Sequence, residues 1–217
     1  MTAAFPPDPK PRPLLTRPAF TGLAGLLTGA LLVGVPWLVT SRSGAEPDGR
    51  PLAAPAALGE LGRTEDAVAK IDNVRGQAQI ARVGKADRET GARVSAAYGG
   101  AAAVVQEYRD DRLLRGLQLT AVRAASPELI ATYEDPQALG VAKPGTELVR
   151  VGAVQCLVHN DPAAPGSAPD PELSFVTNCQ RTGPGLTVAV RSLGADGNRD
   201  PAKIASLLDQ AWDTLSR

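Results

Sequence analysis

The sequence is poor in the side chains that most often carry chemistry. Its 217 residues include one histidine, two cysteines and one methionine, and only 4% are aromatic. Acidic and basic residues number 23 each, so the formal net charge is zero. Without a basic excess there is no electrostatic footprint for nucleic acid, and we expect no nucleic-acid partner. With so few aromatic residues, any core must be built from small and aliphatic side chains.

Signatures of known catalytic and cofactor sites are also missing. The sequence has no Gly-x-Ser-x-Gly elbow, phosphate-binding loop, dinucleotide fingerprint, His-Glu-x-x-His pair or EF-hand loop. His159 follows Cys156 by three residues, a spacing that places the two on opposite faces of a strand and disfavours a nucleophilic pair. A lone histidine among scattered acids does not supply the converging ligands of a metal site. We therefore predict no catalytic residue, no metal and no cofactor, and we do not expect an enzyme.

The one long hydrophobic run lies near the N-terminus. Residues 19–39 carry no charge, and as a helix they would span roughly 31 Å, the thickness of the hydrocarbon core of a bilayer. We predict a transmembrane helix over residues 19–41, with the lipid bilayer as its partner. Lys10, Arg12 and Arg17 precede the run, whereas the arginines that follow it are mixed with acids. The positive-inside rule then places the N-terminus in the cytoplasm and the remainder outside the cell.

A cleaved signal peptide is the competing interpretation of this run. Small residues at 43–45 suit a signal peptidase, and a cut after Ala45 would release a secreted soluble domain. The apolar core of a signal peptide is usually about 7–15 residues long, shorter than this run, which favours a retained anchor. In that case residues 1–18 are a disordered, Pro-rich cytoplasmic tail, 42–60 a flexible linker and 61–217 an extracytoplasmic domain.

Both cysteines, Cys156 and Cys179, lie downstream of the apolar run. An even number of cysteines in an extracytoplasmic segment favours a disulfide. If residues 153–159 and 173–181 pair as antiparallel strands, the two cysteines meet on the face that also carries Val154 and Val158. The alternative is two reduced, buried cysteines that act as small hydrophobic residues.

Helical patterns lie at both ends of the predicted domain, and strand patterns lie between them. Thr64 is a candidate N-cap for one or two helical segments between residues 64 and 92, and Ser126 for a short helix broken by Asp135, Pro136 and Gly140. The C-terminal helix is expected over residues 200–215, with Asp200 as its cap and Pro201 in its first turn. Strands are predicted at 94–98, 103–109, 117–123, 147–158, 173–181 and 186–191, the first two joined as a hairpin through Gly99 and Gly100. This order predicts an α+β fold, an antiparallel sheet covered on one face by helices.

Two pairs of neighbouring acids are the strongest candidates for acid–base chemistry. Asp110 and Asp111 form one pair, and Glu134 and Asp135 form the other. Both pairs lie beside turn signals, where acids usually cap backbone groups and meet solvent. They support an alternative function, a membrane-tethered hydrolase that acts on envelope polymer.

The three tyrosines, Tyr98, Tyr108 and Tyr133, are candidates to line a ligand groove. Packing in or around the core is the commoner fate of a tyrosine side chain.

Three stretches are distinctive: Val94-Ser-Ala-Ala-Tyr-Gly-Gly100, Ala121-Val-Arg-Ala-Ala-Ser-Pro127, and Val154-Gln-Cys156 with Asn178-Cys-Gln-Arg-Thr182. Together they resemble a group of actinobacterial single-pass membrane proteins that have an extracytoplasmic domain and no assigned activity. The resemblance covers about residues 55–215. It implies an envelope location and transfers no catalytic residue. The strand, disulfide and helix at the C-terminal end also look distantly like the extracellular sensor domains of actinobacterial membrane kinases, a likeness of fold alone.

These observations converge on a membrane-anchored binding, sensing or interaction module of the cell envelope. Its partner would be an envelope protein or a small ligand.

Overall fold

The computed structural model describes residues 49–70, 74–194 and 198–217. The chain divides into two units, Met1–Glu46 and Pro47–Arg217, and the description below concerns the second. The predicted cytoplasmic tail, the transmembrane helix and the first part of the linker lie outside the described residues. Within the described ranges, no helix has both the length and the apolar character that a membrane span requires.

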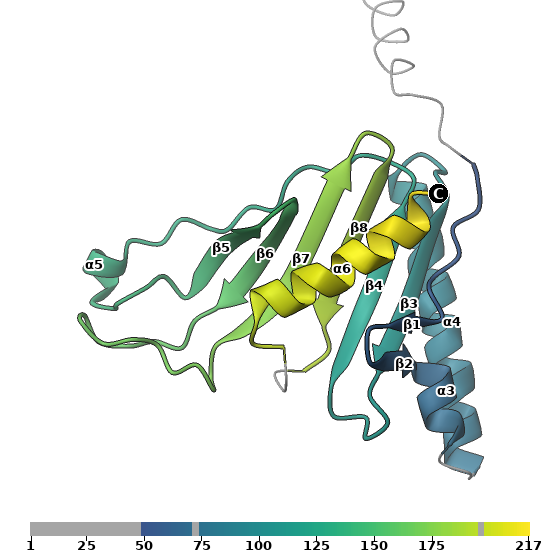
Figure 1. Cartoon of the computed structure of the whole chain (residues 1–217), viewed down its shortest axis with the longest axis horizontal. Coiled ribbons are helices and arrows are strands. Elements are labelled where there is room, and N and C mark those ends of the chain that lie inside the picture. Colours follow the sequence, from purple (N-terminus) through teal and green to yellow (C-terminus); the bar gives the residue numbers. More distant parts are fainter. Residues whose placement is uncertain (1–48, 71–73, 195–197) are drawn as a thin grey trace, which may run out of the picture. The chain divides into compact units, whose positions relative to one another are not determined.

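An eight-stranded antiparallel sheet forms the centre of this unit (Figure 1). The strands lie side by side in the order β1-β2-β3-β4-β8-β7-β6-β5, so β1 and β5 are the two edges. Four hairpins, β1–β2, β3–β4, β5–β6 and β7–β8, join neighbours in the sequence. The bounds are β1 Ala57–Leu58, β2 Leu61–Arg63, β3 Ala103–Arg109, β4 Gly116–Val122, β5 Thr146–Val151, β6 Val154–His159, β7 Phe175–Gly183 and β8 Leu186–Ser192.

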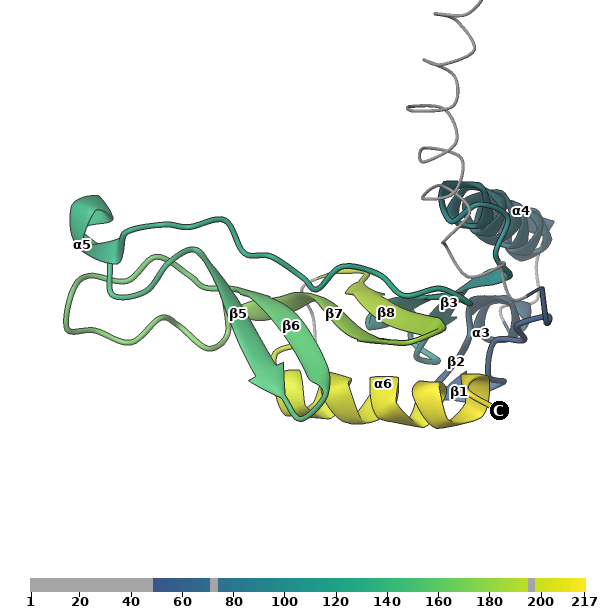
Figure 2. The ribbon, with the colours of Figure 1, turned by 90° about the horizontal axis from the view of Figure 1, so that it is seen from above.

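Helices lie on both faces of the sheet (Figure 2). Helix α6 (Pro201–Leu215) packs across β6, β7 and β8 on one face. Helix α4 (Val74–Ala97) packs against β3 on the other face, beside the short α3 (Thr64–Ala69). The predicted α+β class and antiparallel sheet are therefore confirmed, but the prediction that helices cover a single face is wrong.

The hydrophobic core lies between the sheet and α6, and simple alternation along the strands builds it. Every second residue of β4 and β8 points toward α6 and is buried, and α6 contributes a stripe of the predicted helical spacing. Burying one such aliphatic side chain stabilises the fold by about 1.5–3 kcal/mol. These core residues are Leu117, Leu119, Ala121, Leu186, Val188, Val190, Ile204, Leu208, Ala211 and Leu215. As predicted, Asp200 caps α6, accepting a hydrogen bond from Ala202 N at 2.8 Å.

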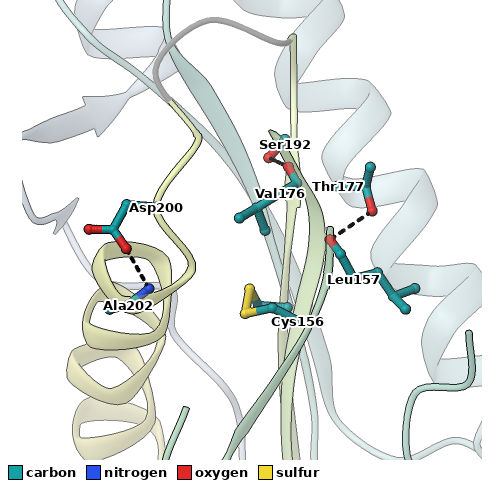
Figure 3. Close-up of a disulfide and its surroundings, with 8 residues drawn as sticks. Cys156, Leu157, Val176, Thr177, Ser192, Asp200 and Ala202 are labelled. Atoms are coloured by element: carbon teal, nitrogen blue, oxygen red, sulfur yellow. Dashed lines mark hydrogen bonds between the residues drawn. A yellow bond between two sulfur atoms is a disulfide. The ribbon is translucent and has the colours of Figure 1, made fainter. Parts of the chain in front are cut away.

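The predicted disulfide is confirmed. Cys156 on β6 and Cys179 on β7 are directly opposite in the antiparallel register and are bonded to each other. Both are fully buried, on the same face as Val154 and Val158. Figure 3 shows the bond on the α6 side of the two strands and the Thr177 side chain on the other side.

The strand predicted at 94–98 is wrong, because residues 94–97 form the last turn of α4 and Tyr98 begins the turn that follows it. Val83, Asp87, Gly91 and Val94 follow helical spacing along the side of α4 that faces the sheet. A five-residue run is too short to distinguish a strand from the continuation of such a helix. The two glycines expected to join a hairpin instead end the helix, with φ of 68° and 92°, and Gly100 N donates to Ser95 O at 2.8 Å.

Two further boundaries differ from the prediction. The run over 147–158 is two strands, because Gly152 (φ 58°) opens a two-residue turn between β5 and β6. No helix begins at Ser126. The short helix is α5 (Pro136–Leu139), which Asp135 caps by accepting from Gln137 N and Ala138 N. The residues read as breakers therefore start and end a helix: Pro136 is its first residue, and Gly140 its left-handed C-cap.

The later part of the predicted linker belongs to the folded unit. Leu58 on β1 is 1% exposed and contributes to the core. Pro55 O accepts hydrogen bonds from the Tyr108 hydroxyl at 2.7 Å and from Arg63 Nε at 3.3 Å. Residues 54–60 are thus held by the sheet and do not act as a flexible spacer.

Candidate functional site: a groove on the open face of the sheet

A groove of about 760 Å³ lies on the sheet face opposite α6. Its floor is made by β4, β8 and β7, the three central strands. Val94 of α4 and Tyr98, the residue that follows this helix, form one wall, and Ser126 from the segment after β4 lies at one end. The groove exists because α4 covers β3 and reaches only the near side of β4, whereas α6 lies wholly on the opposite face (Figure 2).

The floor is a grid of three rows, each with one side chain from β4, β8 and β7. The strand register fixes the rows, since directly opposed residues in antiparallel strands share a face. Ala189 is at the centre, and its small side chain leaves the floor low there. In the order β4, β8, β7, the rows are Gln118–Arg191–Asn178, Thr120–Ala189–Gln180 and Val122–Thr187–Thr182.

A bulge in β7 brings Phe175 to this groove. The register between β6 and β7 shifts at Leu157/Val158, and Thr177 is the extra residue. Thr177 Oγ1 donates to Leu157 O at 3.1 Å (Figure 3). Since a bulge reverses the alternation of side chains, Phe175 faces the groove while Cys179 faces the core. Simple alternation along the predicted strand 173–181 would place Leu173, Phe175 and Cys179 on one face. The bulge separates Phe175 from Cys179, and Leu173 precedes β7 and is exposed.

Hydrogen bonds tie the segment after β4 to the floor at one end of the groove. Ser126 N donates to Thr182 Oγ1 at 3.0 Å, and Gln180 Nε2 donates to Pro127 O at 2.7 Å. Across the groove, the Ser126 and Tyr98 hydroxyls lie 2.6 Å apart and share a hydrogen bond. This contact joins α4 to the segment and closes that end of the groove.

The other end of the floor carries a polar chain that leads from α4 into the groove. Asp87 on α4 accepts hydrogen bonds from Glu107 N at 2.9 Å and from Gln118 Nε2 at 3.5 Å. Gln118 Oε1 in turn accepts from Arg191 Nη2 at 3.0 Å. The three side chains thus connect a buried carboxylate to an exposed guanidinium.

Burial is the main influence on the Asp87 carboxyl and raises its pKa above the ordinary value. The hydrogen bonds from Glu107 N and Gln118 act in the opposite direction, and the nearby Glu107 and Glu65 carboxylates add to the rise. Asp87 is 5% exposed and does not line the groove, so its role there is exerted through Gln118.

A second hollow, of about 610 Å³, lies along the edge of β3 beside α4. Glu65, Asp87 and Arg88 are its charged lining residues. Both acids already accept hydrogen bonds within the protein: Asp87 accepts from Glu107 N, and Glu65 Oε2 accepts from Gln106 Nε2 at 2.9 Å. The groove over β4, β8 and β7 has more polar side chains that lack a hydrogen-bond partner among the described residues, and it is the better candidate site.

The four acids singled out in the sequence hold local structure and do not come together. Asp110 accepts Leu114 N and Arg115 N in the β3–β4 turn. Desolvation raises its pKa, but these two hydrogen bonds and the Arg115 guanidinium together outweigh that effect and leave the pKa below its ordinary value. Asp111 pairs with the Lys70 ammonium. Glu134 accepts Gly145 N at 2.6 Å, and Asp135 caps α5, beyond the β5 edge (Figure 1).

The tyrosines have three different environments. Tyr98 lines the groove, as one hypothesis had it. Tyr108 is completely buried in the core, and Tyr133 is 87% exposed. His159 packs against Phe175 with ring centroids 5.1 Å apart, on the face opposite the disulfide. Within the described ranges, no group of three or more histidine, cysteine or acidic side chains is arranged to hold a metal ion.

Sequence reasoning missed the residues that shape the groove. None of the floor residues Gln118, Thr120, Asn178, Thr187, Ala189 and Arg191 was singled out from the sequence. The alternation that identified the core also implied a second face, and that face was the available signal. Comparisons with protein-family models, curated proteins and solved structures find no match to this chain.

Proposed function

We propose that this protein is a binding module of the cell envelope and that its ligand lies in the groove over β4, β8 and β7. Largely preformed concave sites with a few convergent polar groups are the usual form of a ligand site. The second half of the proposal, a membrane anchor at residues 19–41 with this unit outside the cell, rests on the sequence patterns given above.

One observation carries the proposal. The floor offers polar side chains that make no hydrogen bond within the described parts of the chain, namely those of Thr120 and Asn178, around the small Ala189. The walls add apolar surface from Val94 and Phe175. Such a surface can bind a molecule that is partly apolar and partly polar, and it presents no pair of acids for hydrolysis.

Fragment binding to the full chain tests the proposal. With the purified, isotope-labelled protein in a nonionic detergent, we expect water-soluble fragments with one ring and one polar group to shift the amide NMR signals of Thr120, Ala189 and Gln180. Ala189→Phe places a ring at the low point of the floor and should abolish those shifts. Ala81→Phe, on an exposed position of α4, is the matched control and should leave them intact.

The proposal fails if no fragment shifts these signals, or if the same shifts persist in Ala189→Phe. A far-UV circular dichroism spectrum equal to that of the unmodified protein shows that the variant is folded.

The location has its own test. Protease added to intact cells should cleave within residues 49–217 if this unit lies outside. Protection of these residues until the cells are lysed would contradict the proposed location. A mature N-terminus at Glu46 would show instead that the protein is secreted.

A further inference from the structure

The chemistry of the groove narrows the ligand class. We propose that the ligand carries an oxyanion, a carboxylate or a phosphate, which binds between Arg191 and Asn178, while an apolar body lies along the remaining floor. This inference rests on the proposed function, because it specifies the ligand of the same groove.

The first argument is charge. Among the described residues that line the groove, Arg191 is the one charged side chain, and none of them carries a carboxylate. Among the described residues, Arg191 has no acidic partner: its hydrogen bond goes to the neutral amide of Gln118. A lone cation in a groove with partly apolar walls gives a local positive potential that attracts an anion.

The second argument is the way Arg191 is held. A carboxylate can only accept hydrogen bonds, so Asp87 requires the NH₂ group of Gln118 to point toward it. The Gln118 carbonyl oxygen is thereby turned toward Arg191, where it accepts from Nη2. This contact uses one of the five N–H donors of the guanidinium and leaves the rest in a planar fork, which matches the two oxygens of an oxyanion.

The third argument is Asn178, which lies directly opposite Arg191 on β7. Directly opposed side chains have Cβ atoms about 4.5–5.5 Å apart, so both can reach one small group. The Asn178 amide has no hydrogen-bond partner within the part of the chain described, and its NH₂ is free to donate. Arg191 and Asn178 together form a clamp with neutral and charged donors.

The rest of the groove floor determines the size and polarity of the apolar part of the ligand. From Arg191 to Thr187 the groove follows four residues of β8, about 14 Å. Ala189 and Val122 supply apolar floor, and the Tyr98–Ser126 contact closes the far end. A ligand with its anionic group at Arg191 therefore has space for a ring or a short chain.

Matched probes test this inference. 4-Phenylbutyrate and 4-phenylbutyramide have the same shape and differ in charge, acetate is the oxyanion without the body, and phenyl phosphate offers the other oxyanion. Dissociation constants are measured from the shifts of groove amides in the full chain. We expect 4-phenylbutyrate to bind at least about tenfold more tightly than the amide or acetate, as a charge-assisted contact predicts. Whichever acid binds more tightly identifies the preferred oxyanion.

Arg191→Gln should raise the dissociation constant of 4-phenylbutyrate about tenfold or more and leave that of the amide within about twofold, since only the charge-assisted contact is lost. Arg191→Lys should recover part of the affinity for the acid. The matched control is Arg150→Gln, an exposed arginine on β5 at the edge of the same sheet face, which should change neither constant.

Three results would overturn the inference. The acid and the amide bind equally, Arg191→Gln affects both equally, or acetate binds as tightly as 4-phenylbutyrate. In each case the proposed function survives if the bound probe is lost in Ala189→Phe. If no bound probe depends on Ala189, the proposed function itself fails.

Discussion

Asp87 on α4 accepts the backbone N–H of Glu107 on β3 at 2.9 Å. Strand β2 pairs only with Tyr108 and Arg109, so this N–H lies on a part of the β3 edge that no strand covers. A helix side chain thus replaces the missing strand at this point. The same carboxylate contacts Gln118, so one residue links the packing of α4 to the orientation of the groove floor.

Asp87→Ala should lower the free energy of unfolding by about 1–3 kcal/mol, because Glu107 N–H would lose its partner in a partly buried position. Urea denaturation followed by circular dichroism measures the change. Asp87→Asn keeps an acceptor oxygen and should cost less. An Ala variant as stable as the unmodified protein would show that water replaces the carboxylate without loss.

The stability contributed by Asp87 should depend on pH. Burial raises the pKa of Asp87 in the folded state above the ordinary value of 3.8. At pH values between 3.8 and the folded-state pKa, the folded chain therefore keeps a proton that the unfolded chain has lost. Unfolding free energy falls with pH wherever the folded state binds more protons. The unmodified protein should therefore lose stability relative to Asp87→Asn as pH rises from 3.8 to the higher folded pKa, and the difference should be constant above it. A difference that grows in the opposite direction would contradict the raised pKa.

Removing the disulfide should destabilise the fold without changing its architecture. Cys156 and Cys179 are 23 residues apart, and closing a loop of that length stabilises by about 3 kcal/mol on the chain-entropy model. Cys156→Ala/Cys179→Ala should lose about that amount, plus a smaller loss of packing, in urea denaturation. Dithiothreitol should destabilise the unmodified protein and leave the double variant unchanged; an equal effect on both would refute the assignment.

The same substitution at two buried threonines should have opposite effects. Thr64 Oγ1 is buried and has no hydrogen-bond partner among the described residues, so Thr64→Val should raise the unfolding free energy by about 1 kcal/mol. The Thr187 hydroxyl lies 2.8 Å from Ala124 O and 2.9 Å from Thr182 Oγ1. Thr187→Val should therefore cost about 1–3 kcal/mol, because it leaves partners unsatisfied. Thermal unfolding of the two variants measures these changes. A shift of both midpoints in the same direction would contradict the prediction.

Arg123, at the end of β4, is 9% exposed, and its Nε has no hydrogen-bond partner in the described structure. A buried donor without a partner costs about 1–3 kcal/mol. Arg123→Met keeps most of the packing volume and should raise the unfolding free energy by about 1 kcal/mol. Arg181→Met is the contrasting variant, since Arg181 pairs with Asp209 at 2.7 Å and lies over the Trp212 ring, and it should be destabilising.

The sequence predicted correctly those parts of the fold in which the pattern of residues fits only one type of secondary structure. The alternation of Leu186, Val188 and Val190 identified a strand with one buried face, and the 200–215 stripe identified α6 with its cap. The pairing that brings Cys156 to Cys179 followed from the expected antiparallel pairing of residues 153–159 and 173–181. In each case the hydrophobic pattern, the secondary-structure propensity and the turn or capping residues agree, which is the condition for a reliable prediction.

The failures have a shared physical cause, which is that local signals were read without their tertiary partners. The short run 94–98 fits either a strand or the end of a helix, and the packing of α4 against β3 decides between the two. Asp135 and Pro136 break a helix that precedes them but start one that follows. Alternation along the strands implied a second sheet face, but not which residues meet on it, because Gln118, Arg191 and Asn178 come together only through the order in which β4, β8 and β7 pair.

The placement of the disulfide has a consequence for the durability of the groove. Both sulfur atoms lie on the α6 side of the sheet, and the residues that line the groove include neither cysteine nor methionine. These are the side chains that peroxides attack most readily. An oxidising environment would therefore keep the bond between β6 and β7 intact while leaving every surface offered to the ligand chemically unaltered.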